Sequence, residues 1–264
     1  MNISVIGSSH SVIDLRDKDL TKLKFKDYSV LGHQDYMSII NNGPKIITDG
    51  CSGSVDSVVG VRLFHQFFKA LPNKTSLKHF EDNVTEVFEK LIDVCSEPFK
   101  EFKDAEPSLM SRNLLFTIIA LFETEEEFVV KMLGDGYIIT ENLVSQISYI
   151  GINHNNRPPY KAYDYMIEQM QDPIDLERQQ FKTFMFSKKL YKSVGIASDG
   201  IATATENNIS FDDLQKFDRW LLNHENLPEV MAFNRINTFI KNNHKWFYDD
   251  TTIMFKEETG TYEC

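Results

Sequence analysis

Short runs of β-branched and aromatic residues recur along the whole chain, and turn-forming residues close most of them. Such runs predict β-strands, and they limit the chain to folds rich in sheet. Turn sequences at Asn41-Asn42-Gly43-Pro44 and at Gly134-Asp135-Gly136 each separate two runs, and we interpret both as hairpins. Hairpins imply antiparallel sheets. The predicted strands are 3–6, 25–31, 37–40, 45–48, 114–122, 127–133, 137–140, 183–187, 193–197 and 251–255.

Helical periodicity occupies the gaps between these strands. Apolar residues repeat every three or four positions over 58–68, 80–94, 211–221 and 230–240. Strand runs interrupted by helix pairs predict an α+β fold with sheets in the centre and helices outside. No linker rich in Pro, Gly or Ser divides the 264 residues, so we expect a single domain over 1–264 with a polar excursion at about 145–180.

Charge and cysteine content exclude several classes of protein. The chain has 28 Lys and Arg against 39 Asp and Glu, a net charge of −11, which argues against general binding to nucleic acid or to anionic membranes. No apolar stretch is long enough to span a bilayer, and the N-terminus does not resemble a signal peptide. Cys51, Cys95 and Cys264 are too widely spaced for a zinc site or a disulfide framework. A cytoplasmic protein is expected.

Acidic residues lie at the ends of several predicted strands. An Asp at a strand end is held rigidly, and a following Gly allows the backbone to approach a ligand closely. Each Asp-Gly alone is explained by an ordinary turn. Several converging carboxylates, however, would repel one another unless cations lay between them, and oxygen donors without His or Cys favour magnesium or manganese. These acidic residues are Asp35, Asp49, Asp135, Asp199 and Asp249.

The segments that carry these residues occur in a recognisable order. The set resembles the metal-dependent type 2C (PPM) serine/threonine protein phosphatases, and is most similar to their divergent bacterial branch. The resemblance runs from residue 3 to about residue 256 and implies a four-layer sandwich, in which two central antiparallel β-sheets are flanked by helix pairs. The matching segments are Gly32-His33-Gln34-Asp35, Thr48-Asp49-Gly50-Cys51-Ser52-Gly53-Ser54, Leu133-Gly134-Asp135-Gly136-Tyr137, Ala197-Ser198-Asp199-Gly200-Ile201 and Asp249-Asp250-Thr251-Thr252-Ile253.

The resemblance also implies a metal site. Asp49 would bridge two metal ions, and the carbonyl of Gly50 would ligate one of them. Asp199 and Asp249 would complete the site of the other ion. Asp35 matches an early acidic position that reaches the metals directly or through water, and Asp49 and Asp35 are the implied catalytic residues.

Asp135, together with Asp199, matches positions that hold a weaker third ion in some members of the family. The implied cofactors are therefore two divalent cations, Mn²⁺ or Mg²⁺, with a third in some members. The implied reaction is hydrolysis of phosphoserine and phosphothreonine on proteins by a metal-bridging hydroxide, which attacks phosphorus in line. The implied partners are a phosphorylated protein substrate and a partner kinase, and we expect a monomer. The excursion at 145–180 falls where the family has a flap that shapes substrate access.

Two departures from the family pattern leave alternatives open. Cys51 stands where many members carry a His that is a candidate general acid, so protonation of the leaving group must come from elsewhere. The family's phosphate-binding Arg is missing from 27–34, and His10, His33 and Arg16 are equal candidates to replace it. A pseudophosphatase that acts as an interaction module, or an enzyme for small phosphorylated molecules, is the alternative hypothesis.

Overall fold

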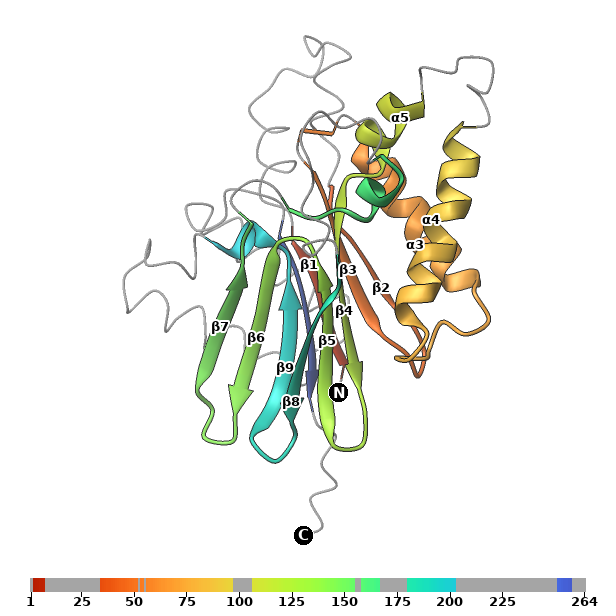
Figure 1. Ribbon diagram of the computed structural model, residues 1–264. Helices are drawn as coiled ribbons and strands as arrows, with labels where there is room; N and C mark the ends of the chain where they lie inside the picture. The colour runs from red at the N-terminus through yellow and green to blue at the C-terminus, as the bar shows by residue number, and fades with distance from the viewer. Residues whose placement is uncertain are drawn as a thin grey trace.

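The computed structural model contains two antiparallel sheets, with helices packed against one of them (Figure 1). Sheet I has the strand order β1 (Asn2–Gly7), β10 (Thr251–Glu257), β9 (Tyr191–Ala197), β6 (Gly136–Asn142) and β7 (Ile147–Ile152). Sheet II has the order β2 (Tyr36–Ile39), β3 (Lys45–Gly50), β4 (Phe116–Glu123), β5 (Glu127–Leu133) and β8 (Lys182–Ser187). The structure describes residues 2–7, 34–51, 53–54, 56–96, 106–154, 158–166, 180–202 and 251–257.

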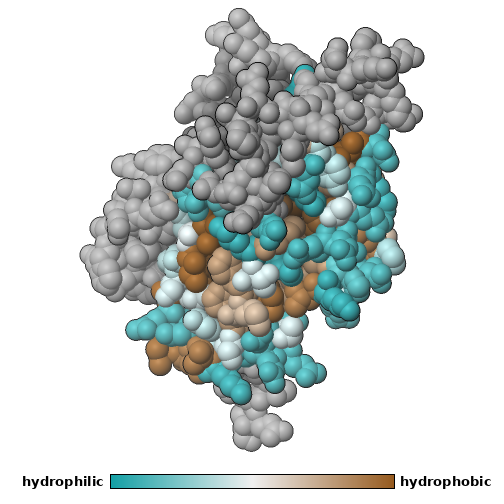
Figure 2. All heavy atoms as spheres, viewed as in Figure 1, coloured by the Kyte–Doolittle hydropathy of each residue, from teal (hydrophilic) through white to brown (hydrophobic). Residues whose placement is uncertain are grey.

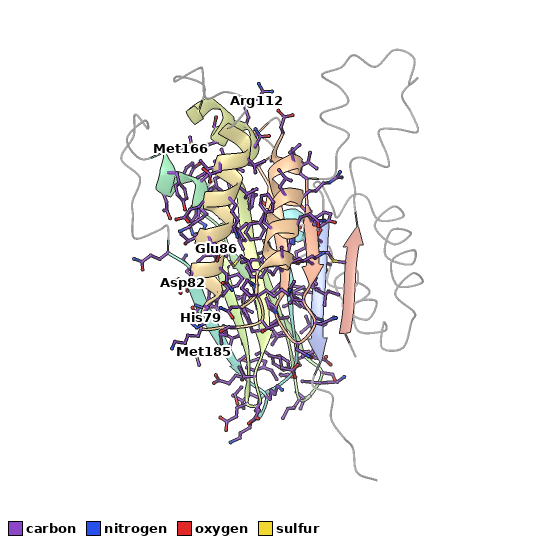
Figure 3. All side chains as sticks on the ribbon, turned by 90° about the vertical axis from the view of Figure 1, so that its right-hand side faces the viewer. His79, Asp82, Glu86, Arg112, Met166 and Met185 are labelled. Carbon is purple, nitrogen blue, oxygen red and sulfur yellow. The ribbon has the colours of Figure 1, made fainter. Side chains whose placement is uncertain are left out.

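Helices α3 (Ser57–Ala70), α4 (Phe80–Ser96) and α5 (Glu106–Asn113) cover the outer face of sheet II. Helix α5 is joined to the start of α3, because Arg112 forms an ion pair of 2.9 Å with Asp56 and its carbonyl accepts a hydrogen bond from the Asp56 N–H. The outer surface of α4 is hydrophilic in Figure 2, and Figure 3 shows His79, Asp82 and Glu86 along this side. Among the described helices, none is long and apolar enough to cross a membrane.

Strand β4 shows why the sandwich has two cores. Its residues alternate between the faces of sheet II, since successive strand side chains lie on opposite sides. Phe116 and Ile118 pack against the helices, whereas Ile119 and Leu121 pack against sheet I. Both faces are buried, so the middle of the strand, 118–122, is a continuous apolar run rather than an alternation with polar residues. The second core is closed by Ile138, Val194, Ile196 and Met254 of sheet I.

The α+β prediction is confirmed, and the strands predicted in the described part of the chain are all present within a few residues of their expected bounds. One connection was predicted wrongly. Gly134-Asp135-Gly136 is not a hairpin within one sheet, because β5 belongs to sheet II and β6 to sheet I. Positive φ angles of 104° at Gly134 and 148° at Gly136 allow the chain to turn between the two sheets there.

Among the described residues, one strand and one α-helix were not predicted. Strand β7 lies inside the segment expected as an excursion, and helix α5 lies in a stretch without a clear apolar period. The predicted strand at 25–31 and the predicted helices at 211–221 and 230–240 lie outside the described residues. The outer helical layer that the four-layer prediction places on sheet I is therefore not described.

Candidate active site

Side chains alternate between the two faces of a strand, and this alternation places four polar residues between the two sheets. They lie at the end where β3 and β9 finish. Asp49 lies two residues after Ile47, which is part of the core between the sheets, so both are on the same face of β3. Ser198 follows Ile196 in the same way, and Thr252 precedes Met254. Asp35 stands two residues before Met37, whose side chain packs against this core.

Asp35 is the most deeply buried of the predicted acidic residues within the described part of the chain. Its side chain is 4% exposed, and its Oδ2 accepts a hydrogen bond of 2.7 Å from the Ser198 hydroxyl. The same hydroxyl accepts a hydrogen bond of 3.0 Å from the Thr252 N–H, and the Thr252 carbonyl accepts one of 3.0 Å from the Ser198 N–H. This network joins three of the segments that carry the family resemblance.

Asp49 is held through its backbone. Its N–H donates a hydrogen bond of 3.2 Å to the hydroxyl of Thr117, the residue opposite it on β4. The following residue is closely packed, because a Cβ on Gly50 would lie 2.7 Å from the Ser57 Oγ and would displace that side chain. Cys51 continues the loop, and its N–H donates a hydrogen bond of 2.9 Å to the Leu115 carbonyl. The side chain of Asp49 is partly exposed, as a ligand-binding carboxylate requires.

Tyr160 comes from the segment expected to form the flap, and it reaches the Asp49 loop. Its side chain is 6% exposed and packs edge-to-face on Tyr163, with 5.4 Å between the ring centroids. Burial raises the pKa of the Tyr160 phenol, a side-chain hydrogen bond with Cys51 raises it further, and the nearby charge of Asp49 adds to the effect. The phenol therefore stays protonated at neutral pH. The sequence analysis did not foresee this contact between Tyr160 and Cys51.

Asp135 lies on the connection between the sheets and has a histidine partner. Its Oδ1 is 2.5 Å from the His154 Nδ1 and accepts a hydrogen bond of 2.9 Å from the His154 N–H. The Lys182 ammonium lies 3.2 Å from the His154 Nε2. Asp199, the other predicted third-ion ligand, begins the short 3₁₀ helix η6 (Asp199–Ile201) and is exposed. Neither His154 nor Lys182 was singled out by the sequence analysis.

The donor set fits a hard divalent cation only in part. Asp35, Asp49 and Asp199 supply carboxylate oxygens at the same end of the two sheets, which is the chemistry that Mg²⁺ and Mn²⁺ prefer. Among the residues that the structure describes, no three His, Cys, Asp or Glu side chains come close enough to hold a metal ion. Asp249, the remaining predicted ligand, lies outside the described residues.

The candidates for the missing phosphate-binding residue cannot be placed either. His10, His33 and Arg16 lie outside the described residues. Within the described part, the buried His65 was not predicted from sequence, and it belongs to the core between α3 and sheet II rather than to the site. Its ring nitrogens pair with the hydroxyls of Ser38 (2.7 Å) and Thr48 (2.9 Å).

The fold is a sandwich of two central antiparallel sheets, with Asp49-Gly50 and Asp199-Gly200 at the same end of the two sheets. Comparison with protein families identifies its class. The model of the protein phosphatase 2C family matches residues 31–232, which is well over half of the chain. The chain therefore belongs to the protein phosphatase 2C family, as the order of its acidic segments indicated. No curated protein matches the sequence.

Solved structures agree with this assignment at the level of the fold. The serine/threonine phosphatase Stp1 from Staphylococcus aureus has a TM-score of 0.53 at 15% identity, over 87% of this chain and 90% of its own. A bacterial serine phosphatase has a TM-score of 0.53 at 15% identity, over 87% and 93%. PppA, described as a key regulatory component of T6SS in Pseudomonas aeruginosa, has a TM-score of 0.51 at 11% identity, over 86% and 91%. At these identities the likeness shows the shared fold alone.

Proposed function

We propose that this chain is a metal-dependent phosphatase of phosphoserine and phosphothreonine in proteins. The observation that carries the proposal is the meeting of Asp35, the Ser198-Asp199 segment and Thr252 at the sheet end where Asp49 also lies. Membership of the protein phosphatase 2C family supports the reaction class. A phosphorylated protein partner and a cytoplasmic location belong to the same proposal.

In this proposal Asp49, the Gly50 carbonyl, Asp199 and Asp249 would hold two divalent cations, and Asp35 would reach them directly or through water. When bound, the cations supply positive charge for the phosphoryl oxygens and lower the pKa of a water nucleophile. The protein positions these ligands. The Ser198 hydroxyl orients the Asp35 carboxylate, and the Thr117 hydroxyl holds the backbone of Asp49.

Cys51 and Tyr160 have a different role from the histidine found at the Cys51 position in other members. The buried phenol interacts with the thiol beside Asp49. Because the phenol is held protonated, it acts as a hydrogen-bond donor and not as a base. We assign the pair to shaping the site, with Tyr160 fixing the flap segment against it.

Hydrolysis of p-nitrophenyl phosphate and of a phosphothreonine peptide tests the proposal, each with Mn²⁺, with Mg²⁺ and with EDTA. Wild-type protein is expected to turn over both substrates only with metal, and Asp49→Asn should lower kcat/KM by more than about 100-fold. Asp82→Asn is the matched control, because Asp82 is exposed in the first turn of α4 (Figure 3), and α4 packs on the face of sheet II that points away from sheet I. Full activity of Asp49→Asn would overturn the assignment.

The second candidate is an interaction module without activity. It is favoured by one observation, the replacement of the family's histidine by a thiol that interacts with Tyr160. Calorimetric titration with Mn²⁺ separates the two. A folded protein that neither turns over substrate nor binds Mn²⁺ at millimolar concentration would be a binding module, whereas binding together with turnover supports the enzyme.

A further inference from the structure

The Asp135 carboxylate is fixed at the point where the chain crosses from sheet II to sheet I. A Cβ on Gly134 would lie 2.6 Å from the Thr117 Cγ2, and a Cβ on Gly136 would lie 2.8 Å from the Ala197 carbonyl oxygen. Thr117 contacts the backbone of Asp49, and Ala197 directly precedes Ser198. Asp135 therefore lies beside the candidate active site, and its side chain is only 14% exposed.

Two donors from one residue already occupy an oxygen of this carboxylate. The ring Nδ1 of His154 and the main-chain N–H of His154 both contact Asp135 Oδ1, at 2.5 and 2.9 Å. Since the ring nitrogen that faces a carboxylate carries the proton, Nδ1–H is the donor, and Nε2, which faces the Lys182 ammonium, is the acceptor. The Lys182 ammonium, at 3.2 Å from Nε2, is then the donor to the ring.

Lys182 thus donates to the His154 ring, and His154 donates to Asp135. These hydrogen bonds compensate the negative charge of the carboxylate. The His154 side chain is 8% exposed, so the imidazole is held in place by its surroundings. A divalent cation on Asp135 would compete with the two His154 donors and would have the Lys182 ammonium as a near neighbour of the same sign.

We infer that His154, supported by Lys182, takes the place of a third divalent cation at Asp135, so that this phosphatase works with two metal ions. The inference rests on the proposed function for the other two ions. It gives Asp135 a positioning role: the carboxylate ties the connection between the sheets to the residues that follow β7. The Lys182 ammonium then supplies positive charge on this side of the site, and the His154 donors compensate the Asp135 carboxylate.

Manganese binding to the full chain tests the inference, measured by calorimetry and by equilibrium dialysis with metal analysis up to about 10 mM Mn²⁺. Wild-type protein and Asp135→Asn should each bind two ions. His154→Ala should gain a third, weaker ion, which the double variant with Asp135→Asn should lose. The control His79→Ala removes an exposed histidine on the helical side and should bind two ions. A third ion in wild-type protein that disappears in Asp135→Asn would overturn the inference.

A second measurement does not depend on the other two metal ions. The hydrogen-bonded Nδ1–H of His154 should give a resolved downfield proton resonance that is absent in Asp135→Asn and in His154→Ala. The resonance should persist in 10 mM Mg²⁺, a concentration at which a weak site would fill. Its loss on adding Mg²⁺ would show that a cation displaces His154 and would overturn the inference. If wild-type protein binds no metal and the resonance persists, the proposed function fails while the pairing of His154 with Asp135 stands.

Discussion

The Ser198 hydroxyl donates a hydrogen bond of 2.7 Å to Asp35, and this bond joins sheet I to sheet II beside the candidate active site. Ser198 is fully buried at the end of β9, and Asp35 precedes the edge strand β2. The two residues are 163 positions apart in the sequence. Because Ser198 also accepts the Thr252 N–H, one hydroxyl sets the relative positions of three segments.

Ser198→Ala tests this relationship. The substitution removes a donor from a buried carboxylate and an acceptor from a buried N–H, so the free energy of unfolding should fall by about 1–3 kcal/mol. Metal-dependent turnover should fall as well, because Asp35 loses its orientation. Denaturant unfolding and kcat/KM measure the two effects. Ser187→Ala, on β8, is the control and should cost less than about 0.5 kcal/mol. Unchanged stability and turnover in Ser198→Ala would show that the bond has no structural role.

The buried His65 makes the stability of the fold depend on pH. Burial, aided by the positive charge of Lys69, lowers the pKa of His65 to about 3 from its ordinary value of 6.5. Between these values the unfolded chain binds a proton that the folded protein does not. The contribution of His65 to the free energy of unfolding is therefore fully present above pH 6.5. It is lost as the pH falls toward 3, with a slope of up to about 1.4 kcal/mol per pH unit.

The variant His65→Gln isolates this contribution, since glutamine keeps a hydrogen-bonding side chain without a titrating ring. Between pH 7 and pH 4.5, the free energy of unfolding of His65→Gln should depend less steeply on pH than that of wild type. The difference in slope should correspond to close to one proton bound on unfolding. His79→Gln, at an exposed histidine, should retain the wild-type slope. Equal slopes in wild type and His65→Gln would mean that His65 titrates normally in the folded protein.

Gly60 allows α3 and α5 to touch. A Cβ at this position would lie 1.8 Å from the Asn113 carbonyl oxygen, a backbone atom that cannot move without displacing the end of α5. Gly60→Ala should therefore lower the free energy of unfolding by about 3 kcal/mol, although alanine has the higher helix propensity. The adjacent Val59→Ala, at a side chain that is 46% exposed, should change it by less than about 0.5 kcal/mol. Thermal unfolding measures the effect. A Gly60→Ala variant that is more stable than wild type would refute the close contact between Gly60 and Asn113.

Gly134 connects backbone geometry to activity. Its φ of 104° is strained for any residue with a Cβ, and an added Cβ would lie 2.6 Å from the Thr117 Cγ2. Displacement of Thr117 would disturb its hydrogen bond with the Asp49 N–H, so Gly134→Ala should lose about 1–3 kcal/mol of stability and reduce kcat. Gly53→Ala is the control in the Asp49 loop, because its nearest neighbour, the Cys51 Sγ, is 3.7 Å away. The prediction fails if both variants have wild-type kcat.

Local sequence predicted the elements in which one physical signal dominates. Helix α4 follows the three-and-four spacing that begins at Phe80, and β5 matches its predicted bounds of 127–133. Strand β7 was missed because it is a half-exposed edge strand with Gly151 next to its last residue, so its apolar pattern is weak. Helix α5 was missed because it is only eight residues long and contains Pro107 and few apolar residues.

The sequence by itself determined which residues have strand or helix periodicity, and it placed acidic residues at the ends of the strands in an order typical of one phosphatase family. It could not distinguish a hairpin from a crossing at Gly134-Asp135-Gly136, because both use the same turn residues. The register in which β6 pairs with β7 brought His154 to Asp135. Only the packing of sheet I on sheet II decided that Ser198 meets Asp35. These two residues are distant in sequence, and the hydrogen bond between them exists only once burial of the apolar faces has brought the two sheets together.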